Sequence, residues 1–365
     1  MAGRNPGVES LGHDSPATVE LDHSMIRQAV LLVGGRGTRM WPLTADRPKA
    51  LLPVAGVPFI ELQFRLLAEV GVEEVILTVG REHEVAWKDY AAGVDHPRVV
   101  VSVEESPLDT AGPVCAVCPQ LDDRFLVLNG DVVLEGELER FVAEAPELPA
   151  VLALVEVADP SAYGVVVTAQ DGTVERFIEK PPPGTASART INAGMYLMTR
   201  QVLERYPPGR LSFEREVFPA LVESGELGGV TISGEWLDIG TPDLYLAAHD
   251  AVAAGRSRLV QFPGRIDGAW SYISPSAEVE SDALVEEAIV LDGARVRSGA
   301  TVRRAVIGWG AEVENGATVT GASLIGAGAV VGAGCEIDRG ARVAPHTKLE
   351  PGSVTFSPPG EREDA

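Results

Sequence analysis

The stretch from Leu32 to Pro53, LVGGRGTRMWPLTADRPKALLP, places three glycines and several cations around one turn. It continues an apolar run, Ala29 to Val33, that is typical of a buried strand. Gly34, Gly35 and Gly37 therefore predict a loop at the end of that strand. A glycine-rich turn lets backbone N–H groups approach a phosphate chain, and neighbouring Arg and Lys side chains neutralise its charge. The stretch predicts a phosphate-binding loop in an α/β domain.

Two common phosphate loops are excluded by the residues that follow. No Gly-Lys-Ser/Thr ends the loop, as a Walker A loop requires, and Thr38-Arg39 stands where a dinucleotide fingerprint has helix-packing residues. A tight turn with solvated cations is the alternative. The long tail, which includes Arg39, Pro48-Lys49 and Leu52-Pro53, favours a functional loop.

This segment resembles the signature of the sugar-1-phosphate nucleotidylyltransferases, which runs roughly GGxGTRLxPLTxxxPKxLxPV. Met40 departs from it, because leucine is usual there, but the two side chains have similar volumes. The resemblance continues to about Ala254 and is strongest to the mannose-1-phosphate guanylyltransferase group, through TAG-Pro, NAG and WLDIGT motifs and a repetitive tail. The matching positions are Gly34, Gly35, Gly37, Thr38, Arg39, Pro42, Leu43, Thr44, Pro48, Lys49, Leu51, Pro53 and Val54.

Composition limits the partners. The chain has 365 residues and a net charge of −23, which argues against nucleic acid because its phosphates would be repelled. Five cations lie between Arg27 and Lys49 against one anion, Asp46, so we expect small polyanions to be drawn to that loop.

No apolar run approaches the roughly 18 residues of a membrane span. Three cysteines without a framework and a polar stretch 1–25, interpreted as a disordered tail without a secretory signal, predict a cytoplasmic protein.

The first half of the chain alternates strand-like and helix-like segments, which predicts a Rossmann-like, mostly parallel sheet with helices on both faces. After Ala150 the pattern becomes richer in strands, and a helix is expected over 242–254, at the end of a catalytic domain spanning 26–254. The expected strands are 29–33, 75–79, 99–103, 125–128, 151–157, 164–168, 174–178 and 194–198, and the expected helices are 58–70, 83–92 and 110–119.

From Ile273 an aliphatic residue recurs every six positions, with two intervals of five, after Val285 and after Val302. Small residues fill the positions between. This hexapeptide period predicts a left-handed parallel β-helix over 273–354, joined by a linker over 255–272 and followed by a disordered tail over 355–365. Ordinary hairpins would not keep this register.

The resemblance implies a reaction in which an oxygen of a sugar 1-phosphate attacks the α-phosphorus of a nucleoside triphosphate and pyrophosphate leaves. Such chemistry needs positioning, charge neutralisation and Mg²⁺. The resemblance assigns Arg39 and Lys49 to the reacting phosphates and Asp131 and Asp238 to Mg²⁺, whose oxygen ligands suit it. The nucleotide-binding residues that it implies are Leu32, Gly34, Gly35, Gly37, Thr38, Arg39, Thr110, Gly112 and Asn129.

The sugar side is implied by Phe177-Ile178-Glu179-Lys180-Pro181, which resembles the family's (V/I)EKP motif. Its Glu179 would contact sugar hydroxyls, and its Lys180, also catalytic, the sugar phosphate. Adjacent strand residues face opposite sides, so both can serve one site only if the chain bends at the prolines that follow. Gly164 and Asn192, in neighbouring motifs, would complete the pocket.

The base would be recognised by Glu104 to Gly112, which resembles EExPLGTAG with Asp109 in place of the usual glycine. If that glycine has a positive φ, aspartate is tolerated better than most residues but at a cost. The choice of base therefore stays open, with GTP favoured.

Several alternatives remain at this point. The acceptor is mannose-1-phosphate-like, or a sugar-like cyclitol phosphate such as valienol 1-phosphate, or glucose 1-phosphate used with another triphosphate. A catalytically silent regulatory paralogue is disfavoured because Arg39, Lys49, Asp131, Lys180 and Asp238 are all present. Acyl transfer by the repeats is disfavoured because His346 is the one histidine after Ile273, so the β-helix is expected to support a homo-oligomer.

Overall fold

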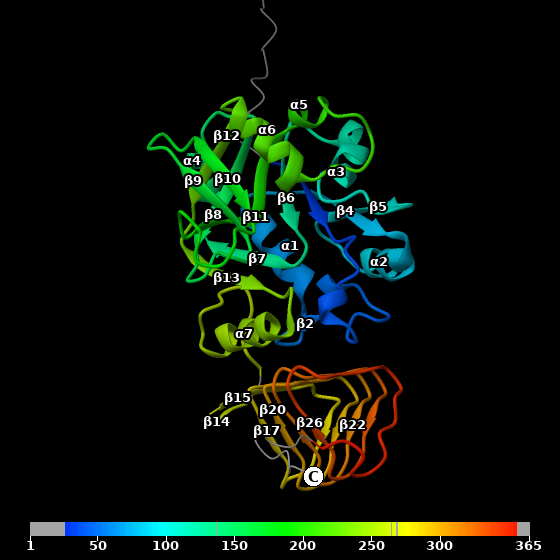
Figure 1. The fold of residues 1–365 in the computed structure, drawn as a ribbon. Helices are drawn as coiled ribbons and strands as arrows, with labels where there is room; N and C mark the ends of the chain where they lie inside the picture. Colours follow the sequence, from blue (N-terminus) through cyan, green and yellow to red (C-terminus); the bar gives the residue numbers. More distant parts are fainter. Residues whose placement is uncertain (1–25, 137, 264, 268, 356–365) are drawn as a thin grey trace, which may run out of the picture.

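The computed structural model describes residues 26–136, 138–263, 265–267 and 269–355, so both predicted tails lie outside the described residues except for Thr355. An α/β body occupies most of the chain, and a stack of short strands from the C-terminal part lies directly beneath it (Figure 1). The predicted fold class, a Rossmann-like domain followed by a parallel β-helix, is confirmed.

The large sheet has the order β10-β9-β11-β6-β1-β4-β5, and β8 joins it by pairing with β11 and β12. Strand β1 is parallel to β4 and β6, whereas β11 is antiparallel to β6, so the sheet is parallel around the glycine loop and antiparallel beyond it. Its strands are β1 (Gln28–Leu32), β4 (Glu74–Gly80), β5 (Arg98–Glu104), β6 (Arg124–Asn129), β8 (Ala150–Glu156), β9 (Gly164–Thr168), β10 (Val174–Glu179), β11 (Thr190–Thr199) and β12 (Leu227–Thr231).

Helices cover both faces of this sheet because its central strands are apolar on both sides. In β1, Ala29 and Leu31 pack into one cluster with α1, α2, α4 and α7, while Val30 packs into another with α3, α5 and α6. The helices are α1 (Phe59–Glu69), α2 (Glu84–Ala92), α3 (Gly112–Val117), α4 (Leu138–Glu144), α5 (Arg200–Leu203), α6 (Phe218–Glu223) and α7 (Pro242–Ala253), with short helices η1 (Thr38–Met40), η2 (Lys49–Leu51), η3 (Arg81–His83), η4 (Cys118–Gln120) and η5 (Phe213–Val217).

Two small two-stranded pairings shape the surroundings of the glycine loop. Strand β7 (Val132–Gly136) pairs antiparallel with β13 (Gly234–Asp238), and β2 (Pro53–Val54) pairs with β3 (Val57–Pro58). The sequence pattern did not predict β7 or β13. Their pairing matters because it joins two segments about a hundred positions apart in the chain, directly after the end of β6.

The C-terminal part forms three parallel ladders that make the sides of the β-helix. The predicted inward aliphatic positions line its interior, where Val290, Val302 and Val319 are fully buried. The first ladder is β15 (Ala269–Ile273), β18 (Ala288–Val290), β21 (Val306–Ile307), β24 (Leu324–Ile325) and β27 (Arg342–Val343), and β14 (Arg265–Asp267) pairs antiparallel with β15 at its edge. The second is β16 (Glu278–Val279), β19 (Arg295–Val296), β22 (Glu312–Val313) and β25 (Val330–Val331), and the third is β17 (Leu284–Glu286), β20 (Thr301–Arg303), β23 (Thr318–Val319) and β26 (Glu336–Ile337).

The predicted linker over 255–272 is too long. Strand β15 pairs in parallel with β18, so β-helix structure begins at Ala269. The first ladder also faces the catalytic domain: Ile289, Val306 and Leu324 belong to the same buried cluster as α1 and α7. The two domains therefore share one apolar core.

His249 of α7 lies at this joint. Its Nε2 accepts from the Ala55 N–H at 3.1 Å, its Nδ1 lies 3.0 Å from the Tyr245 carbonyl, and its ring stacks on Trp270 with centroids 5.8 Å apart. The side chain is fully buried, and burial lowers its pKa from 6.5 to about 4. The native state thus holds the imidazole neutral.

We expect acid to weaken this joint. Because the folded pKa is the lower one, an unfolded chain binds a proton more readily, and stability is lost as pH falls from about 6.5 to 4, by about 3 kcal/mol from this group. Unfolding by urea at pH 7 and pH 4.5 measures the loss. The loss should shrink in His249→Gln and persist in the exposed control His346→Asn; equal losses in both variants would contradict the assignment.

Candidate active site

A cavity of about 660 Å³ opens at the carboxyl ends of β1, β4, β5 and β6. This is the edge at which ligands bind in open α/β sheets. Among the predicted site residues, those that line it are Leu32, Gly34, Gly35, Arg39, Lys49, Thr110, Asn129, Asp131 and Lys180. The predicted site residues that do not line it are Gly37, Thr38, Gly112, Gly164, Glu179, Asn192 and Asp238.

The glycines of the loop have distinct steric reasons. Gly37 has a φ of 60°, and a Cβ there would meet the Thr44 Cγ2 at 3.0 Å and the Lys49 Cβ at 3.2 Å. A Cβ on Gly34 would collide with the Glu104 carboxylate across the cavity. The loop therefore needs glycine to turn at one position and to let Glu104 approach at the other.

The cations of the loop are only partly gathered as expected. Arg36, Arg39 and Lys49 line the cavity, and Arg81 and Lys180 join them from other segments. Arg47 instead lies over the Trp309 ring of the β-helix, 3.9 Å from the centroid, and Arg27 is not part of the lining. Closeness in sequence therefore did not predict which cations line the cavity, because Arg47 points toward the β-helix instead.

Lys49, Asp131 and Asp238 come together at the inner end of the cavity. The Lys49 ammonium forms an ion pair with the Asp131 carboxylate. The β7–β13 pairing brings Asp238 opposite Val132, and the Ile239 N–H donates to the Asp131 carbonyl at 3.0 Å. Two carboxylates from distant segments thereby share one corner.

Gln63 of α1, which the sequence interpretation missed, fixes this corner from behind. Its buried Nε2 donates to the carbonyls of Asn129 and Val132, at 2.8 and 2.9 Å, on either side of Asp131. A glutamine on an amphipathic helix is usually exposed, so the sequence did not predict that Gln63 is buried.

The two carboxylates are electrostatically unequal. Burial acts to raise the pKa of Asp131, but the charges of Lys49 and Arg39 outweigh it and hold the pKa below its ordinary value. Burial and the neighbouring Asp131 charge raise the pKa of Asp238 to about 6. Asp238 accepts one backbone hydrogen bond, from Gly240 N–H at 2.5 Å. Asp238 is therefore held in its charged form less strongly than Asp131.

The expected bend after Glu179 is present. β10 ends at Glu179, and Lys180 takes a φ of 45°, which breaks the strand alternation. The Lys180 ammonium consequently lies on the same side as the Glu179 carboxylate, 2.9 Å away, and remains largely exposed beside the cavity. Tyr163 and Trp236 pack edge to face nearby, with centroids 5.1 Å apart.

Asn129 and Asn192 are linked through a buried tyrosine. The Asn192 Nδ2 donates to the Tyr196 hydroxyl at 3.1 Å, and that hydroxyl lies 3.5 Å from the Asn129 Oδ1. Asn192 Oδ1 also accepts from Gly194 N–H at 3.0 Å. The polar groups of Asn192 are thus engaged with protein, which orients the strand between the two halves of the site.

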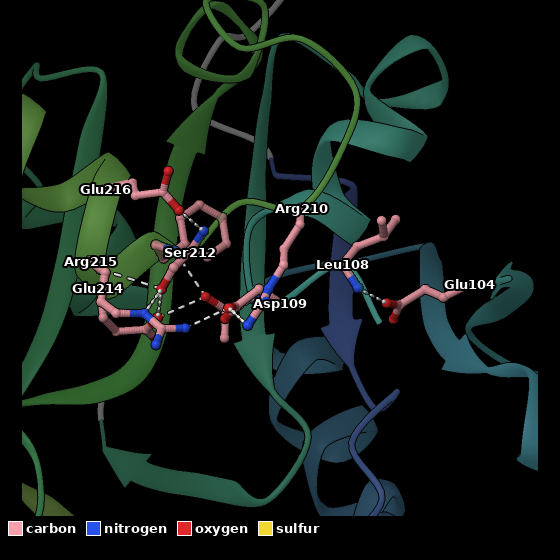
Figure 2. A network of polar contacts seen from close by, with 10 residues as sticks. Glu104, Leu108, Asp109, Arg210, Ser212, Glu214, Arg215 and Glu216 are labelled. Atoms are coloured by element: carbon pink, nitrogen blue, oxygen red, sulfur yellow. Dashed lines mark hydrogen bonds and ion pairs between the residues drawn. The ribbon is translucent and has the colours of Figure 1, made fainter. Parts of the chain in front are cut away.

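The base segment is held by a polar network that Figure 2 shows. Asp109 has a φ of 68°, as its glycine-like position requires, and its Oδ2 accepts from Arg215 at 2.5 Å and lies 3.4 Å from Arg210. The Thr110 hydroxyl donates to Glu214 at 2.7 Å and accepts from Phe213 N–H at 2.9 Å. Thr110 is therefore engaged in fixing the segment.

Glu104 stands at the opposite end of the cavity from Asp131. Its Oε2 accepts from the Leu108 N–H at 3.1 Å (Figure 2). Its Oε1 lies toward Gly34. Burial, and to a smaller extent the Glu82 charge, raise the pKa of Glu104 against the hydrogen bond from Leu108. A carboxylate fixed in this way is an acceptor for a ligand with paired N–H donors.

Known proteins share this arrangement. The family model described as nucleotidyl transferase matches residues 28–255, which is more than half of the chain. The chain belongs to the nucleotidyl transferase family. A second model, the GMPPB C-terminal domain, matches residues 264–355. The family resemblance drawn from the glycine loop is confirmed.

Individual relatives agree. The mannose-1-phosphate guanylyltransferase of Mycobacterium tuberculosis is 34% identical over 290 residues, 73% of this chain and 80% of that protein. A probable mannose-1-phosphate guanylyltransferase 2 of Arabidopsis thaliana is 38% identical over 231 residues, and there the match spans 63% of the relative's length. Among solved structures, HddC from Yersinia pseudotuberculosis complexed with GMP-PN is 27% identical, with a TM-score of 0.55 over 62% of this chain and 99% of HddC. No helix in the described part of the chain is long and apolar enough to cross a membrane.

Proposed function

We propose that this protein transfers GMP from GTP to a sugar 1-phosphate, forming a GDP-sugar and releasing pyrophosphate. The observation that carries the proposal is the corner where Lys49, Asp131 and Asp238 meet, at one end of a cavity bounded by the glycine loop and Arg39. This corner offers fixed cations and two oxygen ligands where phosphates would react.

In this mechanism the chain mainly positions and neutralises. An oxygen of the sugar phosphate attacks the α-phosphorus, the bond from that phosphorus to the bridging oxygen of the β-phosphate breaks, and its electron pair leaves with pyrophosphate. Loop amides at Gly34 and Gly35 bind phosphate oxygens, and Arg39 neutralises the leaving pyrophosphate. Lys49 holds the attacked phosphate. No proton transfer or covalent enzyme intermediate is required.

The carboxylate pair fits Mg²⁺, which we propose as the cofactor. Burial and the neighbouring Asp131 charge raise the pKa of Asp238, and a divalent cation bound between the two carboxylates would offset both effects. No group of three or more His, Cys, Asp or Glu ligands exists among the described residues, so phosphate oxygens and water would complete the shell, as is usual for Mg²⁺. When bound, the ion supplies charge neutralisation at the reacting phosphates.

The acceptor side is proposed to use Lys180 for the sugar phosphate and Glu179 for sugar hydroxyls. Their ion pair and the Lys180 backbone bend keep both groups on one side of β10. The names of the relatives support mannose 1-phosphate. A cyclitol 1-phosphate shares the phosphate and ring hydroxyls, so it remains a test substrate.

Guanine is favoured by Glu104. A guanine ring offers two neighbouring donors, N1–H and the N2 amino group, which a carboxylate accepts together. Uracil and thymine offer one N–H, and adenine presents an acceptor at N1. Glu104 lies in the cavity, and the Leu108 N–H holds its Oε2 in place. Each carboxylate oxygen can accept more than one hydrogen bond, so Glu104 suits guanine best.

The test is a pyrophosphate-release assay of GTP, ATP, UTP, CTP and dTTP against mannose, glucose and cyclitol 1-phosphates. We expect GTP with mannose 1-phosphate to give the highest kcat/KM. A tenfold preference for dTTP or ATP, about 1.4 kcal/mol, would overturn the guanine assignment. No turnover of any pair would favour the silent paralogue instead.

Asp109 should tune nucleotide binding modestly. Asp109→Gly keeps the backbone angle but releases Arg210 and Arg215, which are largely exposed, so we expect about a threefold rise in KM for GTP. Asp109→Asn tolerates the same angle and should fall between this variant and wild type. Asp171→Asn, in the exposed turn after β9, serves as the control. An unchanged KM in Asp109→Gly would show that the ion pairs with Arg210 and Arg215 do not affect nucleotide binding.

We also propose that the β-helix supports a homo-oligomer. Its first ladder packs on the catalytic domain, whereas the second and third face outward and expose Leu284. Light scattering of the purified protein tests this, and a monomer at micromolar concentration would contradict it.

A further inference from the structure

The β-helix contacts the segment that follows the loop glycines at two points, near Arg39 and at Arg47. Arg342, in the last strand of the first ladder, donates from Nη1 to the carbonyls of Arg39 and Trp41, at 2.7 and 2.5 Å. Further along, the Arg47 guanidinium stacks on Trp309. One contact is made at Arg39 itself, and the other is made at Arg47, two residues before Lys49.

The Arg342 contact has a clear local reason. The short helix η1 ends at Met40, and the last carbonyls of a helix lack partners within it. A cationic side chain near this end can bind those carbonyls and complements the negative end of the helix. Arg342 supplies this cap from 303 positions away in the chain for Arg39 and 301 for Trp41.

We propose that Arg342 is a positioning residue: the last strand of the β-helix holds the backbone of Arg39 and thereby aims this side chain at the triphosphate. The β-helix is then part of the catalytic apparatus as well as a scaffold. This inference rests on the proposed function for its kinetic consequence. Its structural part, that Arg342 orders residues 36–45, does not.

Three variants separate this role from general stabilisation. Arg342→Met keeps the apolar stem and removes the donor. Arg342→Lys restores an ammonium that can serve two carbonyls, since both bonds come from one arginine nitrogen. Arg303→Met is the matched control, because Arg303 pairs with Glu286 on the third ladder, away from the loop.

Hydrogen exchange measured by mass spectrometry decides the structural part without any substrate. We expect faster exchange over residues 36–45 in Arg342→Met, partial recovery in Arg342→Lys, and wild-type exchange in Arg303→Met, with similar melting temperatures throughout. Wild-type exchange over 36–45 in Arg342→Met overturns the proposal.

Kinetics supplies the second readout. We expect kcat/KM for GTP to fall about tenfold in Arg342→Met, as for loss of hydrogen bonds that position a charged group. The KM for the sugar phosphate should stay within about twofold, because Glu179 ends β10 and Lys180 follows it, so both lie outside residues 36–45. Equal losses toward both substrates would contradict positioning through Arg39. If wild-type protein turns over no pair, the proposed function fails, and the exchange result still decides the role of Arg342.

Discussion

Asp131→Ala is expected to lower kcat by about three orders of magnitude, or about 4 kcal/mol of transition-state stabilisation. The substitution removes one of the two proposed oxygen ligands of Mg²⁺. It also leaves the mostly buried Lys49 ammonium without its ion-pair partner. Steady-state turnover and magnesium titration by calorimetry measure the effect. Asp171→Asn is the control for loss of a carboxylate elsewhere, and near-normal turnover in Asp131→Ala would refute the metal site.

Asp238→Asn is expected to raise stability at neutral pH while it lowers activity. Because the folded pKa of Asp238, about 6, exceeds its ordinary value of 3.8, stability from this group is present at low pH and is lost as pH rises through 6. The loss amounts to about 3 kcal/mol. Without magnesium at pH 7.5, the variant should therefore melt at a higher temperature than wild type. With magnesium present, it should lose most turnover. Added Mg²⁺ should raise the melting temperature of wild type alone; a shift in both proteins would contradict the assignment.

Glu104→Gln is expected to erase most of the preference for guanine. A carboxylate accepts from both guanine donors, whereas an amide turned to accept one presents its own N–H₂ to the other. A site left with unpaired polar groups rejects its ligand strongly, so we expect the GTP over ATP ratio of kcat/KM to fall about a hundredfold.

The comparison should be made with both nucleotides in the same variant, because a general folding defect lowers both equally. Glu204→Gln is the control, since Glu204 is exposed, pairs with Arg200 and is not among the residues that line the cavity. If Glu104→Gln keeps the full preference for GTP, guanine must be read by other groups.

The sequence predicted most of the fold because its signals were local. The parallel strands around the glycine loop are short apolar runs, and the six-residue period identified the aliphatic residues that line the β-helix interior, although not the small residues buried beside them. The pairing of β7 with β13 was missed, since the exposed-buried alternation of Gly234–Asp238 is weak and its partner lies about a hundred positions earlier. The start of the β-helix was missed because β15 precedes the first full repeat.

The site divides along the same line. Arg39, Lys49 and Asp131 were identifiable because their motifs are contiguous, and the bend at Lys180 followed from strand geometry. Gln63 and Arg342 could not be identified, because burial and a contact spanning three hundred residues leave no local pattern. The arginine partners of Asp109 were hidden for the same reason.

The apolar cluster shared by α1, α7 and the first ladder has a consequence for how this protein can be divided. Expression of the catalytic half alone, ending near Gly255, would uncover side chains that now meet Ile289, Val306 and Leu324, and such a fragment should aggregate. The halves should melt in a single cooperative transition. Exchanging either domain between homologues would then require the apolar interface to be redesigned as well. The catalytic domain and the β-helix are therefore expected to evolve together.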